Sequence, residues 1–313
     1  MAALQALHQT SEIQAYVQAK AIAKALTLET IKARKKRREI LNKTLATIVL
    51  TVGALTMVGP FLWMVSTSLK APGAVFSFQK NWWEEWIPTS FVWQNYVKAW
   101  QVVPFARFYL NSIFVALCVT FGQVATSAMA AYAFARLQFP GRDKVFFAYL
   151  GTMMVPGAVT MIPVFILLKH LGWIDTYKAL ILPGIFTAYG TFMLRQFFLT
   201  LPKDLEDAAK IDGCSYIGIF WRIILPLSKP ALATLTTFTF MGTWMNFMWP
   251  LIVINTQTKY TLPVGLAYFQ SLHNTDWTLL MAASVMMILP ILIVFMVNQR
   301  FFVEGIKLTG IKG

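Results

Sequence analysis

Residues 201–230 read LPKDLEDAAKIDGCSYIGIFWRIILPLSKP, and this charged stretch lies between two long apolar runs. It predicts two short helices, near 203–211 and 215–225. The dipeptide Asp212-Gly213 predicts the turn between them, because glycine adopts a positive φ without steric cost. A charged two-helix loop between apolar runs is typical of a polytopic membrane protein.

The two helices are expected to be amphipathic and sharply bounded. Ser215 is a suitable N-cap for the second helix, and Pro226 is expected to end it. Ala208 and Ala209 leave a low surface against which another protein could pack closely. From these residues alone two interpretations stay open: an amphipathic loop lying on the membrane, or a docking site for a partner.

Outside this loop the chain is strongly apolar. Of its 313 residues, 57% are hydrophobic and 13% charged, against about 25% charged in a soluble domain. A helix needs about 20 apolar residues to cross a bilayer, and the charge-free intervals predict an all-α integral membrane protein with six transmembrane helices within 44–300. The predicted spans are residues 44–67, 110–134, 145–168, 179–199, 230–254 and 278–298.

The distribution of Lys and Arg predicts the orientation. Alternate segments hold 20 and 7 of these residues, and the richer set is expected on the cytoplasmic side. Both termini are therefore predicted to be cytoplasmic, and the run KARKKRR at 32–38 to face anionic lipid headgroups. The segments assigned to the cytoplasm are 1–43, a basic N-terminal segment, 135–144, 195–229 and the residues after 298, which end in a C-terminal tail at 301–313.

Several function classes are disfavoured. The net charge of +14 does not indicate nucleic-acid binding, because the basic residues lie between apolar runs and not on one soluble face. Cys118, Cys214 and three isolated histidines give no metal-ligand spacing. The sequence has no phosphate-binding G-x-x-x-x-G-K-[ST] motif, and no nucleophile stands with a base at a plausible spacing. We therefore expect neither enzyme activity nor a cofactor.

The predicted spans also lack Asp and Glu. Cation-coupled carriers usually need such groups at mid-membrane, so their absence from the spans disfavours that class. Two possibilities remain: a passive path, or transport powered by another subunit through a cytoplasmic contact.

Uncharged polar and aromatic residues within the spans are candidates for a substrate path. Hydroxyl, amide and aromatic groups suit a neutral sugar or polyol, and the cluster TWMNFMW at 243–249 is the preferred contact. For each residue the alternative is interhelical hydrogen bonding and packing. The candidates are Asn111, Tyr189, Thr243, Trp244, Asn246 and Trp249.

The pattern E-D-A-A-x-x-D-G at 206–213, followed by I-x-L-P at 223–226, resembles the EAA loop of permease subunits of ATP-binding-cassette (ABC) importers. Five further stretches resemble the carbohydrate branch of that family, and within it the maltose-type second permease; two of them are NSIFVA at 111–116 and MVPGAVTMIPVFILLKHLGWIDT at 154–176. The resemblance covers about 44–313 and implies a type I ABC importer permease fold in the inner (plasma) membrane. The other three are FVWQNYVKAW at 91–100, YAFARLQFPGRD at 132–143 and QRFFVEGIKLTGIKG at 299–313.

The resemblance implies that the 201–229 loop docks on an ATPase subunit and couples its closure to alternating access. Asp207 takes the position of the family's glutamate, which keeps the charge but shortens the side chain, and Cys214 takes that of an alanine. The docking residues it implies are Glu206, Asp207, Ala208, Ala209, Asp212, Gly213, Ile223, Leu225 and Pro226.

The implied partners are a second permease subunit in a heterodimeric permease, two ATPase subunits that bind ATP and Mg, membrane lipid and an extracytoplasmic solute-binding protein. The outward segments 68–109 and 255–277 are candidates for contact with the binding protein, and the resemblance favours the second. No nucleic acid is expected.

The resulting hypothesis is a permease subunit of an ATP-driven importer for a sugar, oligosaccharide, polyol or glycoside. A glycerol 3-phosphate importer of the same family is an alternative, although the scarcity of Lys and Arg within the spans disfavours a phosphorylated ligand. An ATP-independent channel or secondary carrier, and a membrane scaffold, are the competing classes.

Overall fold

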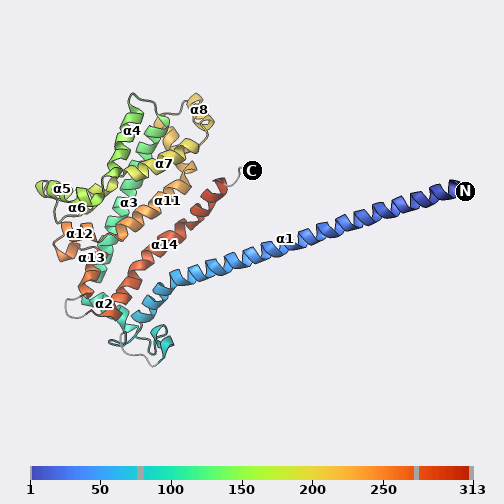
Figure 1. Ribbon diagram of the computed structural model, residues 1–313. Helices are drawn as coiled ribbons and strands as arrows, with labels where there is room; N and C mark the ends of the chain where they lie inside the picture. The colour runs from blue at the N-terminus through green and yellow to red at the C-terminus, as the bar shows by residue number, and fades with distance from the viewer. Residues whose placement is uncertain (1, 76–80, 271–274, 310–313) are drawn as a thin grey trace. The chain divides into compact units, whose positions relative to one another are not determined.

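The computed structural model describes residues 2–75, 81–270 and 275–309, and the described chain is built from helices, with one isolated β-bridge between Gln270 and Thr275 (Figure 1). It divides into two units, Met1–Trp63 and Met64–Gly313. The α-helices are α1 (Ala2–Ser68), α2 (Gln94–Val102), α3 (Phe105–Arg136), α4 (Arg142–Gly151), α5 (Gly157–His170), α6 (Tyr177–Ile181), α7 (Ala188–Thr200), α8 (Asp204–Ile211), α9 (Tyr216–Ile219), α10 (Leu225–Leu227), α11 (Lys229–Trp244), α12 (Met248–Val253), α13 (Leu262–Leu266) and α14 (Trp277–Thr309).

Short 3₁₀ and π segments complete the helical structure. One π-helix, Phe220–Ile224, joins α9 to α10. The 3₁₀ segments are Trp82–Glu85, Thr152–Met154, Leu182–Ile185, Gln257–Lys259 and Ala267–Phe269.

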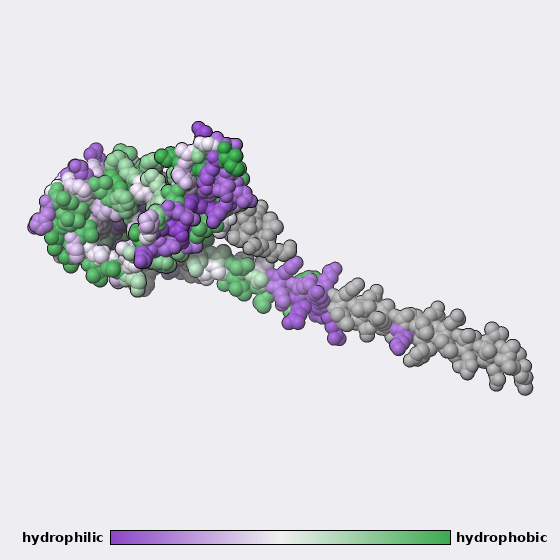
Figure 2. All heavy atoms as spheres, turned by 90° about the horizontal axis from the view of Figure 1, so that it is seen from above, coloured by the Kyte–Doolittle hydropathy of each residue, from purple (hydrophilic) through white to green (hydrophobic). Residues whose placement is uncertain are grey.

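The first unit is a single helix, most of α1. It continues from the predicted basic segment into the first predicted span without a break, and Pro60 lies inside it. Figure 2 shows a hydrophilic band along this helix followed by hydrophobic side chains. Leu50 and Met57 are 72% and 76% exposed, and a helix that is apolar all round fits a lipid environment.

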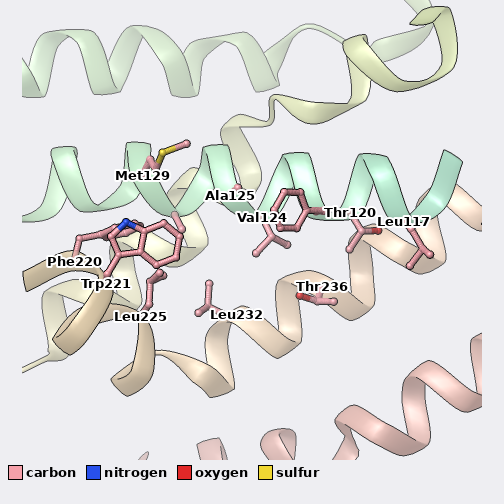
Figure 3. Close-up of a pocket in the computed structure, with 12 residues that line it drawn as sticks. Leu117, Thr120, Val124, Ala125, Met129, Phe220, Trp221, Leu225, Leu232 and Thr236 are labelled. Carbon is pink, nitrogen blue, oxygen red and sulfur yellow. The ribbon is translucent and has the colours of Figure 1, made fainter. Parts of the chain in front are cut away.

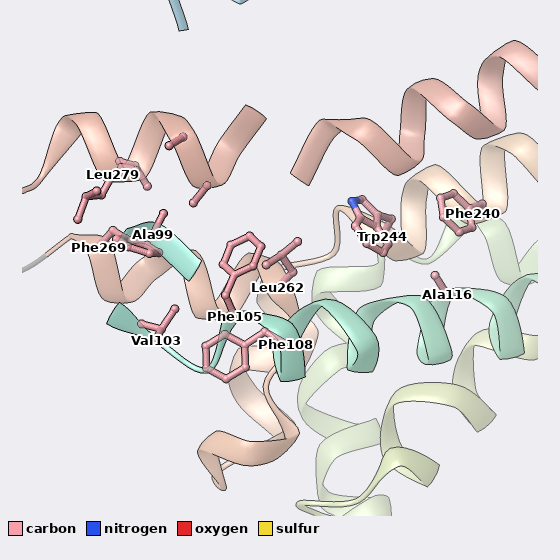
Figure 4. Close-up of a cluster of buried hydrophobic side chains, with 13 residues drawn as sticks. Ala99, Val103, Phe105, Phe108, Ala116, Phe240, Trp244, Leu262, Phe269 and Leu279 are labelled. Carbon is pink, nitrogen blue, oxygen red and sulfur yellow. The ribbon is translucent and has the colours of Figure 1, made fainter. Parts of the chain in front are cut away.

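The second unit is organised around α3, which contacts both α7 and α11, while α11 also contacts α14. One of its cores brings together residues from α2, α3, α11, α13 and α14 (Figure 4). Phe105 and Phe108 of α3 are 1% and 0% exposed, and Trp244 stacks on Phe240 at 5.7 Å between ring centroids.

Small residues allow α3 and α7 to approach closely. A Cβ on Gly190 of α7 would lie 2.5 Å from the Ser127 Oγ of α3 and 3.2 Å from the Leu235 Cδ1 of α11. A larger residue here would force these side chains to move, and small residues are common where helices meet inside membranes.

Two of the predicted later spans are single helices in the structure. Each of α3 and Trp277–Phe301 of α14 is long and apolar enough to cross a bilayer, as is Arg34–Ser68 of α1. Two further pairs meet this test only together, Arg142–Met154 with Gly157–His170 at a bend of 99° and Tyr216–Leu227 with Lys229–Trp244 at 79°.

The predicted third, fourth and fifth spans are broken. The third bends before α5, where Pro156 is the N-cap. The fourth was predicted as one helix over 179–199, but α6, a 3₁₀ turn containing Pro183 and α7 replace it, because proline cannot donate the next helical hydrogen bond. The fifth is interrupted at residues 245–247, between α11 and α12.

Candidate functional site

The first helix of the 201–229 loop ends in a capping motif centred on Gly213. Its φ is +79°, and its N–H donates to the Lys210 carbonyl at 3.0 Å, while the Cys214 N–H donates to the Ala209 carbonyl at 2.9 Å. This pair of bonds is the Schellman motif. A Cβ at Gly213 would meet nothing within 4 Å, so glycine is required by the backbone conformation and not by space.

The second helix of the loop begins as predicted but ends later. The Ser215 Oγ accepts a hydrogen bond from the Gly218 N–H at 3.2 Å. Pro226 was expected to end this helix, yet helical structure continues to Leu227. The π-helical segment explains the difference, since a widened turn before Pro226 accommodates a residue that has no N–H to donate.

The two acidic neighbours of the loop motif have opposite environments. The Glu206 carboxylate is buried and lies 2.9 Å from the Nε of Arg136, at the end of α3. Asp207 is exposed and pairs with Lys210 at 3.0 Å within α8. The hydrogen bond to Asp207 raises the pKa of the Lys210 ammonium group. Asp207 is thus accessible to a partner, whereas Glu206 is not in this conformation.

The loop exposes a mixed apolar and acidic surface. Ile211 is 87% exposed, Ile217 72%, Trp221 63% and Tyr216 59%. Of the predicted docking residues, Ala209 is buried with Glu206, and Ile223 and Leu225 are half-buried. The exposed ones are Asp207, Ala208, Asp212, Gly213 and Pro226.

Two predicted path residues hold helices and loops together. The Asn111 Nδ2 donates to the carbonyls of Thr258 and Tyr260, both at 2.9 Å, and its Oδ1 accepts from the Tyr177 hydroxyl at 2.8 Å. Trp244 is 1% exposed and its Nε1 donates to the Met287 carbonyl at 3.0 Å. Both side chains have the structural role that was the alternative interpretation.

Of the other path candidates, three lie at or near the interruption of the fifth predicted span, and the fourth, Tyr189, is exposed on the surface of the chain. Thr243, Asn246 and Trp249 line a cavity of about 20 Å³, which suits about one water molecule. The Trp249 Nε1 donates to the Ala179 carbonyl at 2.9 Å, and Tyr189 is 45% exposed. In this conformation the cavity is too small for a sugar.

A larger groove of about 380 Å³ lies between α3 and the segment from Phe220 to Leu225 (Figure 3). Leu117, Val124 and Leu232 are among its apolar lining residues. Polar groups that fix an oriented sugar are sparse on these walls, so the groove is a poor candidate for the sugar path.

A junction around Asp175 was not found from the sequence. Asp175 has a φ of +59°, and its carboxylate accepts from the N–H groups of Asn255 and Thr256 at 3.0 and 2.9 Å. It also accepts from the Thr256 hydroxyl at 2.6 Å and the Lys259 ammonium at 3.0 Å. The only advance signal is that aspartate tolerates a left-handed conformation.

The electrostatics of this junction follow from its hydrogen bonds. Burial alone would raise the pKa of the Asp175 carboxyl, but the bonds from Thr256, Lys259 and Asn255 outweigh burial and hold the pKa below its usual range. A charged Asp175 therefore ties the segment before α6 to the segment after α12.

Among the residues that the structure describes, no group of three or more His, Cys, Asp or Glu side chains is placed to hold a metal ion. Figure 1 shows α8 and the start of α4 at one end of the second unit, with α2, α12 and α13 toward the other. The fold and the protruding two-helix loop define a polytopic α-helical membrane protein.

Residues 32–308 match the family model described as binding-protein-dependent transport system inner membrane component. The chain belongs to this family, and it is a multi-pass protein of the inner membrane. This confirms the resemblance to ABC importer permeases.

Several relatives are named for transport. The chain is 40% identical over 203 residues to the arabinooligosaccharides transport system permease protein AraQ of Halalkalibacterium halodurans, covering 65% of this chain and 73% of that one. It is 33% identical to the probable ABC transporter permease protein YurM of Bacillus subtilis, covering 90% and 93%. It is 35% identical to the sn-glycerol-3-phosphate transport system permease protein UgpE of Yersinia pestis, covering 70% and 81%.

A solved structure shares the fold. A chain of a bacterial ABC transporter involved in the import of the acidic polysaccharide alginate aligns with a TM-score of 0.75 at 24% identity, covering 85% of this chain and 98% of that one. The type I ABC permease fold predicted from the sequence is therefore confirmed.

Proposed function

We propose that this chain is the permease subunit of an ATP-driven, binding-protein-dependent importer of a neutral carbohydrate. The observation that carries the proposal is the capped, exposed 201–229 loop in a chain of this family. Its stiff helices and exposed Ile217 and Trp221 offer a surface on which an ATPase subunit can dock. ATPase closure would then move the loop and switch the permease between inward-facing and outward-facing states.

The proposed assembly has a second permease subunit, two ATPase subunits that bind ATP and Mg, and an extracytoplasmic binding protein. A homologous fold appears in a structure of a bacterial alginate ABC transporter in complex with its alginate pentasaccharide-bound periplasmic protein, with a TM-score of 0.57 at 13% identity. That complex supports a binding-protein partner here. The resemblance to importer permeases favours the segment 255–277 as the contact. The chain itself holds no cofactor and performs no hydrolysis.

The proposed topology has six spans with both termini in the cytoplasm. The breaks in the third, fourth and fifth segments are compatible with this count, because non-helical backbone is tolerated at membrane depth where it is buried in protein or lines a cavity. The interruption at 245–247 supports a path near Thr243 and Asn246, since Asn111 and Trp244 are occupied by structural hydrogen bonds.

Glycerol 3-phosphate is the second candidate substrate, favoured by the 35% identity to UgpE. A phosphorylated ligand would favour basic groups along the path, and Thr243, Asn246 and Tyr189 are uncharged. We therefore propose a neutral oligosaccharide, sugar, polyol or glycoside as the substrate.

The test is purification of the full complex, with the second permease and the ATPase co-expressed, followed by uptake into proteoliposomes with the binding protein and ATP. Labelled arabino-oligosaccharides, maltose, a sugar alcohol and glycerol 3-phosphate form the panel. We expect a stable ATPase partner and ATP-dependent uptake of a neutral compound. Purification without an ATPase, or uptake that needs no ATP, would contradict the proposal.

A further inference from the structure

Arg136 joins three elements at one end of the second unit. It is the last residue of α3, and its Nη2 donates to the carbonyls of Phe198 and Leu201, at the end of α7, at 2.6 and 2.7 Å. Its Nε lies 2.9 Å from the Glu206 carboxylate of α8. The two ionic side chains are 3% and 7% exposed, so water has little access to the pair.

A second arginine ties the same helix ends in the opposite direction. The Nε of Arg195 of α7 donates to the Phe134 carbonyl of α3 at 3.1 Å. Its guanidinium also lies over the ring of Phe146 of α4, 4.1 Å from the ring centroid. The ends of α3 and α7 are thus interlocked, and Arg136 adds α8 to this block.

We propose that Arg136 is a positioning residue that carries the displacement of α8 to the ends of α3 and α7, with Glu206 as its attachment point. This inference rests on the proposed function of the 201–229 loop. It assigns Glu206 a role inside the chain, whereas Asp207, which pairs within its own helix, remains free to meet the ATPase.

The link between Arg136 and Glu206 is stiff. A planar guanidinium holds several acceptors in fixed directions, and a buried ion pair is costly to separate because each charge would be left uncompensated. Movement of α8 therefore carries α3 and α7 with it. If the Arg136–Glu206 pair is weakened, α8 can move with the ATPase without moving α3 and α7.

The experiment compares Glu206→Gln and Arg136→Lys with wild type in the full reconstituted complex. The glutamine keeps the size of the side chain but removes its charge, and the lysine keeps the charge but loses the fork that reaches two carbonyls. Glu39→Gln is the matched control, because it removes the same charge from an exposed carboxylate on α1, and not on α3, α7 or α8. ATP hydrolysis and substrate uptake are both measured per purified complex.

We expect both variants to retain ATP hydrolysis but to transport about tenfold less substrate per ATP, a factor within the usual range for coupling between sites. The control should keep the wild-type ratio. A purely structural role predicts instead that hydrolysis and uptake fall together with the amount of intact complex, and that result, or an unchanged ratio, would overturn the inference. If Glu206→Gln does not assemble, Glu206→Asp, which keeps the charge but shortens the reach, should show the same loss of ratio.

Failure of the inference differs from failure of the proposed function. A wild-type complex that lacks an ATPase or transports without ATP would remove the proposed function itself. A wild-type complex that couples normally, with variants that couple equally well, would remove only the role of Arg136.

Discussion

Gly213 can adopt the left-handed conformation at the turn of the 201–229 loop because it has no Cβ. With a φ of +79° and open space around the Cβ position, Gly213→Ala should destabilise the turn locally by about 1 kcal/mol or more through conformation alone. We expect ATP-dependent uptake to fall several-fold while the amount of chain in the membrane stays unchanged.

The matched control is Gly218→Ala in the same loop, where φ is not positive and the new methyl would make an ordinary 3.4 Å contact with the Ser215 Oγ. Gly213→Asn should retain more uptake than Gly213→Ala, because asparagine tolerates the left-handed region better. Equal uptake by all three variants would show that the turn geometry is unimportant for coupling.

The contribution of the junction around Asp175 to stability can be tested by its dependence on pH. Its pKa is lowered in the folded state, so its stabilising contribution is fully present above the unfolded value of about 3.9 and is lost as pH falls through the lower folded value. Asp175→Asn should lower the melting temperature of the purified complex at pH 7 by about 2–4 °C, the shift for roughly 1 kcal/mol. Thr160→Ala, at an exposed helical hydroxyl, is the control.

The same account predicts that the difference between Asp175→Asn and wild type is constant from pH 7 to 5. Melting curves across this range measure it directly. A difference that vanishes by pH 5 would mean that the carboxylate is already protonated there, contrary to the hydrogen bonds that hold it charged.

Residue-level roles were only partly predictable from the sequence. The turn at Gly213 and the N-cap at Ser215 follow from local chemistry, so both were predicted. The pairing of Arg136 with Glu206 joins residues far apart in the chain, and no local pattern specifies such a contact. Asn111 and Trp244 were placed on the substrate path because their chemistry suits a sugar, but the same groups also satisfy backbone carbonyls.

At the scale of elements, the contact between α3 and α7 depends on Gly190. A Cβ at this position would lie 2.5 Å from the Ser127 Oγ, so Gly190→Ala should cost about 1–3 kcal/mol through overpacking. The measurement is the thermal stability and monodispersity of the purified complex.

Gly242→Ala is the control for this contact, since Gly242 lies inside α11 with nothing within 4 Å of its Cβ position. Alanine restricts the unfolded backbone more than glycine does and favours the helix, so Gly242→Ala should leave the stability of the complex unchanged or slightly higher. Similar losses in both variants would mean that α3 and α7 do not pack as described.

Helices were predicted more reliably than their breaks. The apolar runs identify α3 and α14 because exposing backbone polar groups to lipid is unfavourable. Pro156 and Pro183 mark the positions of the bend of 99° before α5 and of the interruption in the fourth predicted span, but the sequence does not predict the angle. Proline marks where a helix can break, but the packing of neighbouring helices determines the angle.

At the scale of the whole molecule, the charge distribution predicts which segments face the cytoplasm. In a chain with Cys118→Ser and Cys214→Ser, a cysteine at Gln257 should react with a membrane-impermeant maleimide in spheroplasts. A cysteine at Lys203 should react only in inside-out vesicles. Both positions are exposed in the structure, so access depends on the side of the membrane, and the reverse pattern would invert the proposed topology.

Photo-cross-linking from position 217 tests most directly whether the 201–229 loop docks on an ATPase. Ile217 is 72% exposed, and Val97 of α2, 56% exposed, is a matched control on the segment proposed to face outward. A benzoylphenylalanine at each position would be activated in the complete complex, with and without ATP. We predict a cross-link to the ATPase subunit from position 217 and none from 97, whereas a loop that cross-links to no ATPase in either state would contradict the account.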